Sequence, residues 1–214
     1  MHSTDITGIE SPFGFEVIGE SGQVFYGGSQ TWFSSLWRRR AGCGPTTGAG
    51  IFAHLAAYHP HLSGLCPYPI REKTDIIELM DEVWDFITPT IHGVNSTTLF
   101  ADGVLKFSRH RGIGLATKVL DISPVSLKRP PAEVVADFLQ GAFEVNLAVA
   151  FLNLCRGEVK NLESWHWVTL AALNRTDMSI LICDQGEKIW IDLGLWLKTS
   201  TRGGGFVLVS GHGT

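Results

Sequence analysis

Several features that reveal a protein's class are scarce in this sequence. Charged residues make up 18% of the 214 positions and the net charge is −4, so the chain lacks the basic surplus that nucleic-acid-binding proteins carry. No run of 18 apolar residues occurs, and the most apolar stretch, at 147–155, is too short to span a bilayer. We therefore expect neither a nucleic-acid partner nor insertion into a membrane.

Cysteines are few and widely spaced. None belongs to a C-x-x-C pair, which argues against a disulfide scaffold and against a thiolate zinc site. No histidine pair has the HExxH spacing, so we expect no metal and no other cofactor. The amino terminus has no basic start followed by an apolar stretch, and we expect a cytoplasmic protein. The four cysteines are Cys43, Cys66, Cys155 and Cys183.

The pattern of apolar residues divides the chain, expected to be a single domain over 1–214, into two parts. Helical spacing dominates from about 43 to 143. From about 145 to 210, β-rich segments alternate with turns such as NRTD and QGE, as in antiparallel hairpins. This order predicts an α+β fold, with a helical first part and an antiparallel sheet in the C-terminal third. The candidate helices are 46–59, 74–87, 97–112 and 130–143.

Cys43 has the setting of a nucleophile. It stands in AGCGPTTGAG, between two glycines and directly before a predicted helix. The unpaired N–H groups and the positive dipole end at a helix amino terminus favour a thiolate. The flanking glycines also let a substrate carbonyl approach the backbone, where the Cys43 N–H can donate to an oxyanion. The alternative is a small residue packed at a tight helix start.

His166 is the histidine that we predict to be the general base. It lies in the predicted strand SWHWVTLAAL, between two tryptophans. The other seven histidines are terminal, lie in loops or polar stretches, or, like His54, stand about three turns along the helix that follows Cys43. The alternative is a structural histidine packed among aromatic side chains.

Four segments resemble papain-like cysteine peptidases, and especially the bacteriocin-leader-processing peptidases and their bacterial relatives. The likeness runs from about Tyr26 to Val209 and is strongest at YGGSQTWF, GCGPTT, VAFLNL and SWHWVTL. It is weak in the helical middle. The resemblance implies a papain-like fold and a hydrolase that cleaves a bond in a peptide or protein substrate, through a thioester on Cys43 with His166 as the base.

The same resemblance supplies two further site residues. The family places an Asp or Asn, which orients the imidazole, where Asp184 ends SILICD, and the NRTD turn would bring this residue back beside the start of the histidine strand, as a cross-strand neighbour of His166. Asp192 in the next segment is the rival. The family's oxyanion glutamine stands upstream of the nucleophile, which suggests Gln30. However, twelve residues separate Gln30 from Cys43, a longer spacing that an enlarged loop would explain, and Gln30 as a plain loop residue is the alternative.

Two other functions use the same residues. An amine can replace water in resolving the thioester, which would make the protein an acyltransferase. A catalytically inactive peptidase fold that binds peptides is the other alternative, although the joint presence of Cys43, His166 and Asp184 argues against it. The run Arg38–Arg40, just before the cysteine motif, indicates either a preference for an acidic substrate or a solvated loop.

Overall fold

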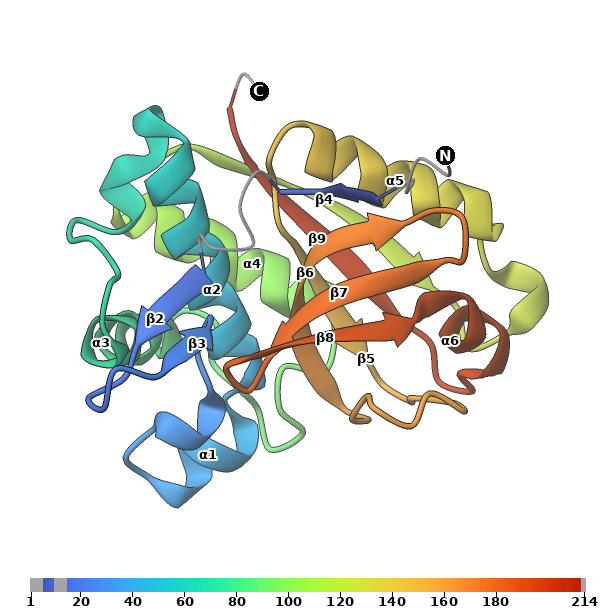
Figure 1. The fold of residues 1–214 in the computed structure, drawn as a ribbon, viewed down its shortest axis with the longest axis horizontal. Coiled ribbons are helices and arrows are strands. Elements are labelled where there is room, and N and C mark those ends of the chain that lie inside the picture. Colours follow the sequence, from blue (N-terminus) through green and yellow to red (C-terminus); the bar gives the residue numbers. More distant parts are fainter. Residues whose placement is uncertain (1–5, 10–14, 213–214) are drawn as a thin grey trace.

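The computed structural model describes residues 6–9 and 15–212, and its largest element is a seven-stranded sheet (Figure 1). All of its strand pairs are antiparallel, in the order β4-β9-β5-β6-β7-β8, and β1 pairs with the far end of β6. The strands are β1 (Ile6–Gly8), β4 (Leu115–Ile122), β5 (Val149–Asn153), β6 (His166–Asn174), β7 (Ser179–Asp184), β8 (Glu187–Asp192) and β9 (Gly204–Gly211); β2 (Glu16–Ile18) and β3 (Val24–Tyr26) form a separate hairpin.

Most of the helices gather beside this sheet, with α1 to α3 on the left of Figure 1 and the sheet on the right. No helix in the described part of the chain is both long enough and apolar enough to cross a membrane. The α-helices are α1 (Leu36–Ala41), α2 (Cys43–Tyr58), α3 (Lys73–Trp84), α4 (Thr97–His110), α5 (Ala132–Glu144) and α6 (Leu193–Thr199), and the short 3-10 turns are η2 (Gln30–Trp32), η3 (Pro60–Leu65) and η4 (Ser126–Lys128).

Aromatic contacts show that helices cover both faces of the sheet. Trp167 of β6 stacks on Phe100 of α4, with ring centroids 4.3 Å apart. Phe151 of β5 meets Trp196 of α6 edge to face at 4.7 Å. Phe151 pairs with Val168, the residue after Trp167, and successive strand residues point to opposite faces. Helices α4 and α6 therefore pack against opposite faces.

The first turns of α2 contain glycines because neighbouring side chains come very close. A Cβ on Gly44 would lie 2.8 Å from Cγ2 of Val94, and one on Gly48 would lie 2.4 Å from Cδ1 of Ile87. Only glycine permits these approaches, so the sequence GCGPTTGAG lets α2 press against the segment that follows α3. On its other side α2 packs on β6, which fixes the helix between the two halves of the molecule.

The α+β class with an antiparallel sheet, expected from the sequence, is confirmed, but the division into two parts is wrong at residues 115–122. This segment, inside the part expected to be helical, forms β4 at one end of the sheet, paired with β9. Only its two end residues, Leu115 and Ile122, are buried. An edge strand of this kind has too little apolar alternation to stand out in a sequence.

The second error concerns KIWIDLGLW at 188–196, one of the segments in the 145–210 part that we expected to be β-rich. Its second half begins α6, because the Asp192 carboxylate accepts a hydrogen bond from the Leu195 N–H at 2.7 Å and caps the helix. The buried residues of α6 then follow helical spacing, at Leu193, Trp196 and Leu197.

Candidate active site

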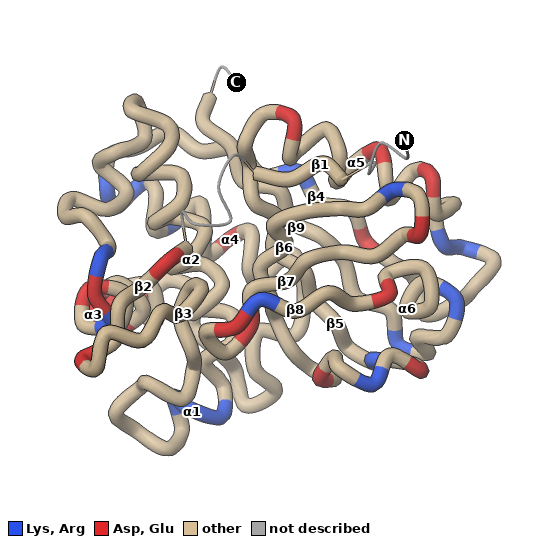
Figure 2. The backbone as a smooth tube through the Cα atoms, viewed as in Figure 1, with Lys and Arg blue, Asp and Glu red and all other residues tan. Residues whose placement is uncertain are grey.

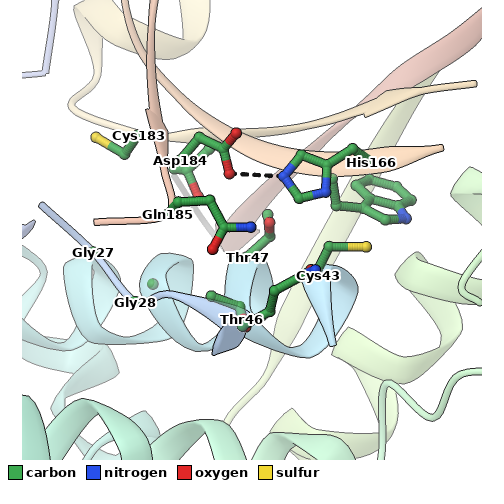
Figure 3. Close-up of a pocket in the computed structure, with 13 residues that line it drawn as sticks. Gly27, Gly28, Cys43, Thr46, Thr47, His166, Cys183, Asp184 and Gln185 are labelled. Carbon is green, nitrogen blue, oxygen red and sulfur yellow. Dashed lines mark hydrogen bonds and ion pairs between the residues drawn. The ribbon is translucent and has the colours of Figure 1, made fainter. Parts of the chain in front are cut away.

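The structure brings Cys43, His166 and Asp184 together where the amino end of α2 meets the sheet (Figure 3). Cys43 is the first residue of α2, His166 the first of β6, and Asp184 the last of β7. His166 Nε2–H donates to Oδ1 of Asp184 at 2.7 Å. Cys43 lies beside the imidazole and lines the same cavity. The imidazole therefore has a carboxylate partner and a thiol as its neighbour.

This environment controls the protonation of His166. Burial alone would lower its pKa, but the hydrogen bond with the Asp184 carboxylate and the nearness of the Cys43 sulfur raise the pKa to about 10. Cys43 contributes a second feature. As the first residue of a 16-residue helix, it has a backbone N–H that the helix does not pair and that lies at the positive end of the dipole. The imidazolium and this N–H therefore place a positive charge and a hydrogen-bond donor beside the Cys43 side chain.

Asp184 reaches His166 through a register that differs from the simple count along the hairpin. Thr169 pairs with Cys183, and one further step places Asp184 opposite Val168. A β-bulge between Leu170 and Ala172 shifts the rest of the hairpin. Asp184 is therefore the diagonal cross-strand neighbour of His166 on the same face, and the hydrogen bond of 2.7 Å between them agrees with the expected cross-strand contact.

Asp192, the rival carboxylate, lies at the open end of the β7–β8 hairpin, whereas Asp184 lies beside its turn. It pairs with Ser179, five residues before Asp184 and so roughly 16 Å away along β7. Its side chain is occupied in capping α6. This position leaves Asp184 as the carboxylate that contacts His166.

Gln30 lines the same small cavity as Cys43 and His166. It begins η2, which is capped by Ser29, and its Oε1 atom is buried without a hydrogen-bond partner among the described residues. The twelve residues between Gln30 and Cys43 do not form the enlarged loop that we expected. Helix α1, capped by Ser35, occupies half of that interval.

Gln185 is a site residue that the sequence analysis did not identify. Both Gln185 and Gly186 have positive φ, 51° and 82°, as a two-residue type I′ hairpin turn requires. The Gln185 Oε1 accepts a hydrogen bond from Ser29 Oγ at 2.6 Å. Its amide nitrogen then points into the cavity near Thr47 (Figure 3). The residues QGE indicated a turn in the sequence, but the contact between Gln185 and Ser29 can be recognised only in the folded structure.

The remaining cysteines differ in reactivity. Cys66 and Cys183 are buried, and burial raises the pKa of both thiols, that of Cys183 to about 12. Cys155 is more exposed, and hydrogen bonds from Thr201 and from nearby backbone groups lower its pKa to about 7. Cys155 is therefore a second reactive thiol outside the site, and it provides an internal reference for any labelling experiment.

Two spaces of very different size adjoin Cys43. The cavity that Gln30 and His166 line holds about 20 Å³, room for a single water molecule or carbonyl oxygen. A groove of about 300 Å³ opens on another side of Cys43. In the described part of the chain no group of three His, Cys, Asp or Glu residues could hold a metal ion. The chemistry available to the described side chains is that of a thiol, an imidazole, a carboxylate and amides.

Replacing Asp184 by Asn should lower the pKa of His166 by roughly 1–3 pH units, because it removes the charge that favours the imidazolium. NMR titration of the His166 ring measures this directly: the midpoint near 10 in the unmodified protein should move toward neutral pH in Asp184→Asn. Asp192→Asn is the matched control. It should leave the midpoint in place, and it should change thermal stability little, because the asparagine oxygen can still accept the Leu195 N–H and cap α6. Equal midpoints in all three proteins would contradict the pairing.

Comparison of the chain with protein-family models and with curated proteins found no match.

Proposed function

We propose that this protein is a papain-like cysteine peptidase that hydrolyses a peptide or amide bond through a thioester on Cys43. One observation carries the proposal: His166 is hydrogen-bonded to the Asp184 carboxylate and lies beside Cys43, and all three residues line one small cavity. A buried imidazole with these two partners has the arrangement of a nucleophile, a base and an orienting residue.

The arrangement of the elements supports a papain-like fold as part of this proposal. A helix that begins at the cysteine packs against an antiparallel sheet, and the histidine and its carboxylate partner stand on adjacent strands of that sheet. The two halves meet at the site, so a substrate bound there would contact both.

In the proposed reaction the Cys43 thiolate attacks the carbonyl carbon, and the carbonyl electrons move to the oxygen. The Cys43 N–H and an amide donor from Gln30 stabilise this oxyanion in the small cavity. When the C–N bond breaks, the imidazolium of His166 gives its proton to the leaving amine. Water then attacks the thioester, His166 accepts the water proton, and the C–S bond breaks to release the acid and restore the thiolate.

The test is digestion of a peptide library by the purified protein, with product termini identified by mass spectrometry. We expect cleavage by the unmodified protein and by Cys155→Ser, and none by Cys43→Ser. Adding a primary amine distinguishes hydrolysis from transfer: acid products support a peptidase, whereas amide products would replace it with an acyltransferase. Peptide binding without cleavage or an acyl-enzyme would instead favour an inactive binding module and overturn the proposal.

A further inference from the structure

We propose that the 300 Å³ groove beside Cys43 selects substrates that present a bulky apolar side chain and a nearby carboxylate close to the scissile bond. This inference rests on the proposed function and assigns a substrate class to the site. We call this space the α1 groove. Its walls come from Trp37 and Arg40 of α1, the segment 91–95, the end of β5 and Trp165.

The α1 groove is much larger than the small cavity that Cys43 and His166 line. About 20 Å³ accommodates one oxygen atom of a substrate but no side chain. The α1 groove, at about 300 Å³, reaches the lower end of the volumes of small-molecule sites, about 300–1,000 Å³. Because both spaces are lined by Cys43, a carbonyl oxygen in the small cavity and a side chain in the α1 groove can be held at the same time.

Three large apolar residues of the α1 groove are exposed. Trp37 is 49% exposed, Trp165 50% and Ile91 85%, and all three converge beside the nucleophile from different parts of the chain. Exposed large apolar groups that cluster around a concave surface mark binding sites, and tryptophan offers a broad, rigid contact area. A phenylalanine or leucine side chain bound here would bury these surfaces.

The arginine run just before Cys43 divides into two structural residues and one free cation. Arg38 forms an ion pair with Asp81 at 2.5 Å. Arg39 donates to the carbonyl oxygens of Phe33 and Ser34, at 2.7 and 3.0 Å. The side chain of Arg40 is exposed and forms no hydrogen bond or ion pair with the residues that the structure describes. Of the three arginines, Arg40 is therefore the one whose guanidinium is available to a ligand.

The charge of the α1 groove is one-sided. Arg40 stands at the carboxyl end of α1, in the basic segment visible in Figure 2. The lining of the α1 groove includes Arg40 and His92 but no aspartate or glutamate. A carboxylate on the substrate would meet a guanidinium with free donors in a fork that suits two oxygens. Either an acidic side chain or a C-terminal carboxylate supplies this chemistry.

The wall of the α1 groove is tied to the catalytic elements. Trp167, next to His166, donates from Nε1 to the carbonyl oxygen of Val94 at 2.6 Å. The Val94 side chain in turn fits against Gly44, next to Cys43. A side chain bound against this wall therefore has a fixed position relative to Cys43 and His166. Such a fixed position is what orients a scissile bond for attack.

The experiment uses peptidyl acyloxymethyl ketones, which alkylate Cys43 without hydrolysis of a peptide bond, so a failed peptidase proposal does not obscure the result. One series varies the peptide part and a second varies the acyloxy part, to sample both sides of the nucleophile. Each compares phenylalanine with alanine, glutamate with glutamine, and a terminal carboxylate with its amide. The rate of Cys43 modification is followed by peptide mass spectrometry.

In one of the two series we expect phenylalanine to react roughly 10- to 100-fold faster than alanine. A carboxylate, on the side chain or at the terminus, should add about fivefold. Trp37→Ala should remove the first preference and Arg40→Gln the second, with each rate divided by the rate of the same variant with iodoacetamide. The matched controls Trp190→Ala and Arg109→Gln remove an exposed tryptophan and an exposed arginine outside the α1 groove. Preferences that are absent, or that persist in Trp37→Ala and Arg40→Gln, would overturn the inference.

Discussion

Replacing His166 by Ala should reduce turnover by roughly 10²–10⁴-fold, because the general base and the proton donor to the leaving amine are both lost. The same change should slow alkylation of Cys43 by iodoacetamide near neutral pH, before any substrate is present. The reason is the raised pKa of about 10, which keeps the imidazole protonated beside the sulfur and so favours the thiolate. The measurement is the fraction of each cysteine alkylated over time, resolved by peptide mass spectrometry.

Cys155 serves as the control within the same sample. Its low pKa of about 7 comes from hydrogen bonds with Thr201 and nearby backbone, not from His166, so its alkylation should be equal in the unmodified protein and in His166→Ala. Cys66 and Cys183 should react slowly in both, since burial raises their pKa values. Unchanged alkylation of Cys43 would remove His166 from the site.

The pH dependence of this reactivity has a defined sign. A histidine whose pKa is raised on folding stabilises the folded state in its protonated form, so His166 contributes stability below its ordinary value near 6.5. That contribution is lost as the pH rises through about 10, where the imidazolium loses its proton. Stability should therefore fall progressively between about pH 6.5 and 10, and turnover should fall near pH 10, where the imidazolium is lost. His166→Ala should abolish the stability change over this range.

Local sequence patterns were sufficient to find the residues at the ends of elements. Cys43 was recognisable because a helix start and two glycines surround it, and His166 because it begins a strand with a clear apolar pattern. Asp184 followed from the short NRTD turn. Its register did not, because the bulge near Ala171 has no marker in the sequence.

What could not be predicted depends on contacts between distant segments. Helix α1 has six residues, too few for a helical period to be detected, so its sequence resembles a loop. Gln185 acquires its orientation from Ser29, which lies 156 residues earlier in the chain. The α1 groove combines α1 with β5 and with the segments before β6 and α4, and no single stretch of sequence contains it.

Replacing Gln30 by Ala should lower turnover by about 10²–10³-fold and leave alkylation of Cys43 by iodoacetamide unchanged. An oxyanion donor acts only when the carbonyl oxygen becomes charged, and alkylation forms no such intermediate. Gln30 fits this role because it shares the 20 Å³ cavity with Cys43, and its carboxamide has a buried oxygen without a partner in the described residues. The measurement pairs steady-state turnover with the alkylation rate in one preparation.

Two variants show whether this effect belongs to Gln30. Gln23→Ala is the matched control, since Gln23 is the other glutamine upstream of Cys43 and its exposed side chain contacts only Ser21 among the hydrogen bonds of the described residues. It should change neither rate. Gln185→Ala tests the second amide at the cavity, whose oxygen is already bound to Ser29 and whose nitrogen is the competing donor. A turnover loss in Gln185→Ala alone would transfer the oxyanion role to Gln185. Loss of both turnover and alkylation in Gln30→Ala would instead assign Gln30 to packing, because an oxyanion donor has no part in forming the thiolate.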